Sequence, residues 1–100
     1  MITDKEIEAL MLQVKHSVGK RFLIKYKMPT MPNSGHGLNF ENKQILGTII
    51  AWNSGFIEWE IVSITTEETL NKSYVETSSI SEMKFSINNI VSNLFNSRAS

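Results

Sequence analysis

The chain contains no cysteine, few prolines and glycines, and no excess of either charge, so its formal net charge is zero. Without cysteine it can form neither a disulfide nor a thiolate metal site, and it has no cysteine nucleophile. A neutral chain also has no overall field to attract nucleic acid or a membrane surface. The 100-residue length and the 41% hydrophobic content predict one compact globular domain over residues 1–100.

Long hydrophobic runs are missing too. The apolar runs FLI and GTIIAW are far shorter than the roughly 20 residues that a membrane-spanning helix needs. The N-terminal stretch MITDKEIEAL is charged from its fourth residue, whereas a signal peptide has an apolar centre. We therefore expect a cytoplasmic protein without membrane contact.

Motifs of catalysis and cofactor binding are absent from the sequence. HExxH, GxSxG, GxGxxG and the P-loop glycine pattern do not occur. The only histidines, His16 and His36, show no metal-ligand spacing with the glutamates. The sequence predicts a protein that is not an enzyme and that binds no cofactor and no metal.

Two amphipathic helices are predicted, at about residues 4–18 and 87–96. Thr3 and Glu6 match the capping box that begins many helices. Apolar residues then recur at helical spacing, namely Ile7, Leu10, Met11, Val14 and Val18. The second helix is expected to begin after Ser86, because a longer helix would place Phe85 on the side opposite its apolar stripe.

Strands are predicted between the helices, at about residues 21–27, 44–52 and 56–64, with a further short strand at 73–77. Asn53-Ser54-Gly55 separates the second and third strands and indicates a β-hairpin. A two-residue loop would put Trp52 and Trp59 on one face, whereas a three-residue loop would pair Trp52 with Phe56 and separate the tryptophans. We favour the two-residue loop because it collects the apolar residues. The predicted fold class is α+β, an antiparallel sheet of three to five strands with an N-terminal and a C-terminal helix packed on it.

A protein-binding surface is the leading hypothesis for a functional site. Residues 28–39 hold both prolines and are expected to form a mobile loop, and such loops often carry function. Flexible methionines suit adaptable binding surfaces, and exposed tryptophan anchors many interfaces. The candidate partner-binding residues are Trp52, Phe56, Met28, Met31 and His36.

The alternative hypothesis is a nucleic-acid-binding module formed by the basic segment from residue 15 to 27. Its candidate residues are Lys15, Lys20, Arg21, Lys25 and Lys27, interleaved with aromatic residues. These cations alternate with the aromatics along a strand, so the two kinds face opposite sides. Lys25 and Lys27 would instead pair across a ladder with Glu58 and Glu60.

These observations favour a small non-catalytic protein that binds another protein. In its size it resembles the compact inhibitors and immunity-type proteins that bacterial or phage mobile elements encode, and its bias toward Ile, Asn, Lys and Ser would suit an A+T-rich source. Nucleic-acid binding remains the alternative. A third hypothesis is a homo-oligomeric accessory protein assembled through its uncharged C-terminal helix.

Overall fold

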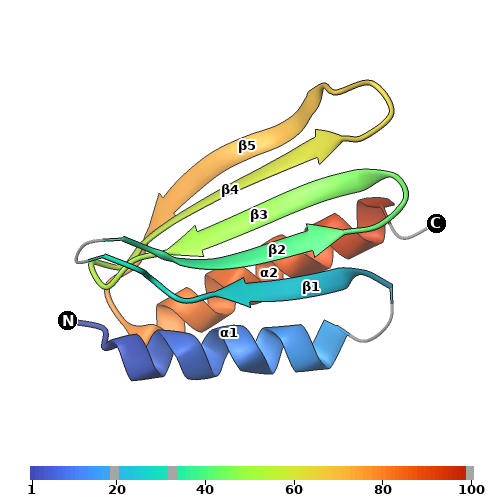
Figure 1. Ribbon diagram of the computed structural model, residues 1–100. Helices are drawn as coiled ribbons and strands as arrows, with labels where there is room; N and C mark the ends of the chain where they lie inside the picture. The colour runs from blue at the N-terminus through green and yellow to red at the C-terminus, as the bar shows by residue number, and fades with distance from the viewer. Residues whose placement is uncertain (19–20, 32–33, 99–100) are drawn as a thin grey trace.

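The computed structural model describes residues 1–18, 21–31 and 34–98, which form an α+β fold (Figure 1). Each strand pairs antiparallel with the next one along the chain, so the sheet order is β1-β2-β3-β4-β5. The strands are β1 (Leu23–Lys27), β2 (His36–Glu41), β3 (Ile45–Ala51), β4 (Phe56–Ser63) and β5 (Thr69–Glu76). Helices α1 (Asp4–Val18) and α2 (Ile80–Arg98) lie against the same face of the sheet. The predicted fold class is confirmed.

The hydrophobic core lies between the two helices and one face of the sheet. Alternate strand residues point into it, which is the pattern of a sheet with one buried face. The buried side chains of the sheet include Ile24, Leu38, Phe40, Ile49 and Ile57, and those of the helices include Ile7, Met11, Val14, Met83 and Ile87. Trp59 packs against this core, and its indole N–H donates to Asn71 Oδ1 at 2.9 Å.

The capping box at the start of α1 forms as predicted. The Thr3 amide donates to Glu6 Oε1 at 3.1 Å, and the Glu6 amide donates to Thr3 Oγ1 at 3.2 Å. Each side chain thus satisfies a backbone donor that would otherwise lack a partner at a helix N-terminus. Ile2 and Ile7 are both buried beside it, and the helix has the predicted bounds of residues 4–18.

Helix α2 begins at Ile80, about two turns before the predicted start near residue 87. Its first turn is capped by Ser79, whose hydroxyl accepts from the Glu82 amide at 3.2 Å. The Glu82 carboxylate in turn accepts from the Ser78 amide at 2.8 Å. The longer helix buries Met83 completely and leaves Phe85 70% exposed. The capped turn and the burial of Met83 therefore outweigh the exposure of one phenyl ring.

The sheet contains one strand that the sequence interpretation missed. The predicted loop at 28–39 is wrong from residue 36 onward, because β2 occupies His36–Glu41 and pairs with β1 and β3. His36, Leu38 and Phe40 alternate into the core, which supplies the energy for strand formation despite the low β-propensity of glycine and asparagine. β5 is longer than the predicted strand at 73–77 and begins at Thr69, while β1 is shorter than 21–27 and begins at Leu23. β3 and β4 differ by one residue at their ends from the predicted 44–52 and 56–64.

The hairpin between β3 and β4 has the three-residue loop. The Trp52 amide donates to the Phe56 carbonyl at 2.9 Å, and Ala51 faces Ile57. The favoured two-residue loop is therefore wrong, and the two tryptophans lie on opposite faces of the sheet. Gly55, the last loop residue, has φ of 96°, a left-handed conformation that glycine adopts without strain.

Candidate functional site

The face of the sheet opposite the helices carries a cluster of aromatic, apolar and charged side chains. No helix within the described ranges lies on this face (Figure 1), which we call the open face. The register of the strands places on it Lys25, Lys27, Asn39, Thr48, Ile50, Trp52, Phe56, Glu58, Glu60, Lys72 and Tyr74. These side chains are half-buried or exposed. Uncovered apolar surface of this kind is a mark of interaction sites.

Three aromatic rings form a row across one end of the open face. The ring centres of Trp52 and Phe56 are 5.5 Å apart, and those of Phe56 and Tyr74 are 5.2 Å apart with nearly parallel planes. The row crosses from the end of β3 over β4 to β5. Aromatic side chains offer a large contact area with few rotatable bonds, so the row is a rigid apolar platform.

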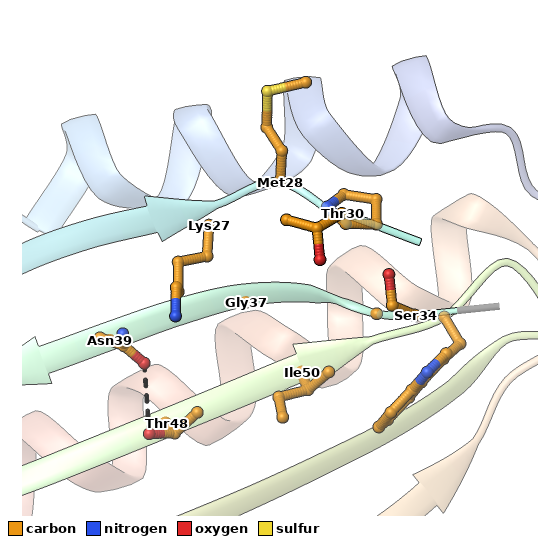
Figure 2. A pocket seen from close by; sticks show the side chains of 11 residues that line it. Lys27, Met28, Thr30, Ser34, Gly37, Asn39, Thr48 and Ile50 are labelled. Atoms are coloured by element: carbon orange, nitrogen blue, oxygen red, sulfur yellow. Dashed lines mark hydrogen bonds between the residues drawn. The ribbon is translucent and has the colours of Figure 1, made fainter. Parts of the chain in front are cut away.

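A hollow of about 550 Å³ opens beside Trp52, between residues 27–30, residues 34–35 and strands β2 and β3 (Figure 2). Its lining includes Lys27, Thr30, Asn39, Thr48, Ile50 and Trp52. In Figure 2 the side chains of Lys27 and Thr30 turn toward β2 and β3, whereas that of Met28 extends the other way. A second hollow, of about 360 Å³, shares Asn39 and Thr48 with the first and includes Lys25. The two hollows lie side by side along the open face.

Gly35 allows the side chains of the hollow to lie close to the backbone. A Cβ at this position would come within 2.9 Å of Trp52 Cε2 and would collide with Ile50 Cγ2. The indole and the isoleucine therefore occupy the space that a larger residue would fill. Gly35 sets the position of Trp52 at the edge of the hollow.

The charges on the open face are segregated. Lys25 and Lys27 lie on β1, whereas Glu58 and Glu60 lie on β4, with β2 and β3 between them. The predicted pairing of these lysines with these glutamates is therefore wrong, and Glu60 Oε2 instead lies 3.7 Å from Lys72 Nζ. Over the part of the chain that the structure describes, Lys25 and Lys27 form no ion pair. Both ammonium groups are available to a partner.

His36 does not belong to this surface, which corrects the expectation that it forms part of an exposed loop. Its side chain is 1% exposed, with Nδ1 at 2.7 Å from the Tyr26 hydroxyl and Nε2 at 3.0 Å from Asp4 Oδ1. Hydrogen bonds from His36 and then Asn53 lower the pKa of Asp4, and burial raises the pKa of Tyr26. Asp4 is therefore an ionised acceptor and Tyr26 a protonated donor. The imidazole connects α1, β1 and β2.

The two methionines of the predicted site are exposed. Met28 is 63% and Met31 70% exposed, in the segment that joins β1 to β2. Met28 borders the hollow beside Trp52. The structure thus brings Trp52 and Phe56 together on the open face, whereas the side chain of Met28 extends away from the hollow.

The basic residues of the alternative site are not brought together. Lys15 is exposed on α1, which packs on the covered face, whereas Lys25 and Lys27 are on the open face. Arg21 is exposed before β1, and Lys20 lies outside the described residues. The sheet therefore separates Lys15 from the two lysines of β1.

Several residues of the open face were not predicted. Tyr74, Asn39, Thr48 and Ile50 are not among the candidate site residues that the sequence indicates. A signal for Tyr74 was present, because Lys72, Tyr74 and Glu76 alternate with Ser73 and Val75 at strand spacing. The missing information was the extent of β5 and the pairing of Trp52 with Phe56.

The described ranges hold no group of three or more histidine, aspartate or glutamate side chains that could bind a metal ion. In those ranges, neither helix combines the length and hydrophobicity needed to cross a membrane.

Comparison with known proteins identifies a family to which this chain is similar. Neither the search of curated proteins nor that of solved structures finds a significant similarity. The family model described as "Immunity protein TriTu" matches residues 3–93. This range takes in α1, all five strands and most of α2. The chain therefore belongs to the TriTu family of immunity proteins.

Proposed function

We propose that this protein is a non-catalytic immunity protein that inhibits a toxin protein in the cytoplasm by binding it through the open face. The family supports the immunity role and implies a toxin as the partner. One observation carries the choice of surface: the row of Trp52, Phe56 and Tyr74 lies on the uncovered face, beside a hollow. Tryptophan and tyrosine in such positions supply much of the binding energy of protein interfaces.

The open face has the physical properties that tight binding requires. Its central side chains project from β3 and β4, which are paired on both sides, so little conformational entropy is lost when a partner docks. The hollow can receive a side chain of the toxin, and the aromatic row can cover apolar toxin surface. Typical interfaces bury about 800 Å² on each partner, an area that fits one face of a five-stranded sheet.

The charge pattern predicts the chemistry of the toxin surface. Unpaired Lys25 and Lys27 favour acidic toxin residues on the β1 side, while Glu58 favours a basic one on the β4 side. Apolar toxin residues would lie between them, over Ile50 and Trp52. Complementary charges at the rim mainly raise the association rate and select the partner.

The test first identifies the toxin. The immobilised wild-type protein captures proteins from its source cells, and the captured protein that kills cells lacking this immunity protein is taken as the toxin. The purified pair is expected to form a stoichiometric complex, and co-expression is expected to protect cells in proportion to complex stability. Protection by a variant that no longer binds the toxin would contradict inhibition by binding.

A charge reversal distinguishes the open face from the helix layer. Lys27→Glu is expected to weaken toxin binding about tenfold, chiefly through slower association at low salt. Lys15→Glu, the matched reversal on α1, is expected to leave the affinity within about twofold. Surface plasmon resonance at two salt concentrations measures both. Equal effects of the two substitutions would reject the open face as the docking surface.

A further inference from the structure

Strand β5 forms one edge of the sheet and is unusually exposed. It pairs with β4 on one side, and no described residue pairs with it on the other. Every side chain of β5 except that of Val75 is exposed, because the strand extends past the helices (Figure 1). An exposed edge of this length presents a row of free N–H and C=O groups that can pair with another strand.

The hydrogen-bond pattern of the hairpins identifies which backbone groups face outward. The Thr77 amide donates to the Gly55 carbonyl at 2.8 Å, and Ile57 and Trp59 face Val75 and Ser73. In an antiparallel ladder, successive residues bond alternately to the two sides. Ser73 and Val75 therefore bond to β4, so the N–H and C=O groups of Lys72, Tyr74 and Glu76 point away from it.

We infer that two copies of this chain associate through antiparallel pairing of β5 with β5, with Tyr74 opposite Tyr74 of the second copy. This register places Lys72 opposite Glu76 of the second copy, and Glu76 opposite Lys72. The three outward-facing residues thus meet one another in hydrogen-bonded pairs. The two sheets become one continuous ten-stranded sheet.

Charge complementarity selects this register. Lys72, Tyr74 and Glu76 share the open face, so each Lys–Glu pair lies on the same side of the joined sheet. A shift by two residues in either direction would place Lys72 opposite Tyr74 or Ser78 and would leave both pairs unmade. Glu76 forms no ion pair with any described residue, and Lys72 would lie between Glu60 of its own chain and Glu76 of the second copy.

Strand β1, at the other edge of the sheet, lacks complementary charges for pairing with a second copy. The charged residues of β1 are Lys25 and Lys27, so a second copy pairing there would bring positive charges together. Like charges opposite one another destabilise strand pairs, and lysine on an edge strand commonly prevents such pairing. Self-association is therefore directed to β5.

The two-fold axis would pass beside Tyr74 and stand perpendicular to the sheet, so both open faces lie on one side of the dimer. The Tyr74 rings would meet at the axis, and each already stacks on Phe56. The aromatic row would continue from one copy to the other. This dimer uses the edge of β5 and leaves the hollow beside Trp52 open, so it does not depend on the proposed toxin binding.

Sedimentation equilibrium of the purified protein, without toxin, tests the inference. The wild type is expected to reach about twice the 11.4 kDa of one chain as its concentration rises. Lys72→Glu and Glu76→Lys are each expected to weaken the dimer at least about tenfold, because like charges then meet. The variant that carries both substitutions should dimerise again, because each pair then joins an acid to a base. An equimolar mixture of the two single variants should also form dimers, in which two acids on one chain face two bases on the other.

Hydrogen exchange locates the interface. The amides of Lys72, Tyr74 and Glu76 are expected to exchange more slowly at high than at low protein concentration. The control substitution is Leu46→Ala on β3, which should leave the dimer unchanged. A monomer at every concentration up to the solubility limit would overturn the inference. So would a dimer that survives both single charge reversals, or one that protects amides elsewhere. Toxin binding that persists in either case would leave the proposed function intact.

Discussion

Trp52→Ala is expected to weaken toxin binding by about 2–4 kcal/mol, or about 30- to 1,000-fold, the range for a central tryptophan of an interface. The indole is half-buried in the free protein, at the edge of the hollow, and lies outside the core cluster. Its remaining surface would become buried only in the complex. The Tm is therefore expected to fall by less than about 5 °C. Titration calorimetry and thermal melting measure the two effects separately.

Phe85→Ala is the matched control for this substitution. Phe85 is a 70% exposed aromatic side chain on α2, so its loss removes exposed aromatic surface from the other side of the molecule. The affinity of the Phe85→Ala variant for the toxin is expected to equal that of the wild type. If Trp52→Ala binds the toxin as tightly as the wild type does, the open face is not the binding surface.

Gly55→Ala is expected to destabilise the fold by about 3–5 kcal/mol, a large part of a typical total of about 5–15 kcal/mol. At a φ of 96° a side chain alone costs about 1–2 kcal/mol. A Cβ at Gly55 would also collide with the Thr77 carbonyl oxygen. The chain would have to move, which would break the hydrogen bonds that the Thr77 amide and hydroxyl donate to the Gly55 carbonyl at 2.8 and 2.7 Å. Each such bond contributes about 1 kcal/mol.

Denaturant unfolding measures this loss, and Gly37→Ala is its control. A Cβ at Gly37 would meet only Lys27 Cβ, at an ordinary distance of 3.7 Å, so this substitution is expected to change the stability by less than about 1 kcal/mol. Equal stabilities of the two variants would show that the loop tolerates a side chain at residue 55. The β3–β4 register would then need another explanation.

The parts of the fold that could be predicted are those with strong local signals. The capping box of Thr3 and Glu6 and the apolar stripe that follows lie within one element, so no tertiary information was needed to define α1. The hairpin was likewise apparent from two β-rich segments that flank Asn53-Ser54-Gly55. Local interactions were sufficient for these elements.

The register of the hairpin could not be predicted from the apolar pattern. Collecting both tryptophans on one face is favourable only if all large apolar side chains belong to the core. Trp59 packs against the core, while Trp52 lies beside Phe56 on the open face. The open face breaks the simple pattern, because it exposes apolar residues that folding alone would bury.

The burial of His36 could not be predicted from the sequence either. In sequence this histidine stands in a glycine-rich segment and resembles a loop residue. Its burial depends on Asp4 and Tyr26, which are 32 and 10 positions away. Long-range hydrogen bonds of this kind leave no local signal, so both β2 and the loss of His36 from the candidate surface became apparent only in the folded protein.

Fluorine NMR of Trp52 in the complex tests toxin binding through the open face most directly. A Trp59→Phe variant grown with fluorotryptophan carries its only fluorine label at Trp52, because the chain has two tryptophans. The unlabelled toxin contributes no fluorine signal. The proposed function predicts that saturating toxin shifts the Trp52 resonance and protects it from line broadening by a soluble nitroxide. A resonance with unchanged position and unchanged broadening, in a sample shown to contain the stoichiometric complex, would contradict toxin binding through the open face.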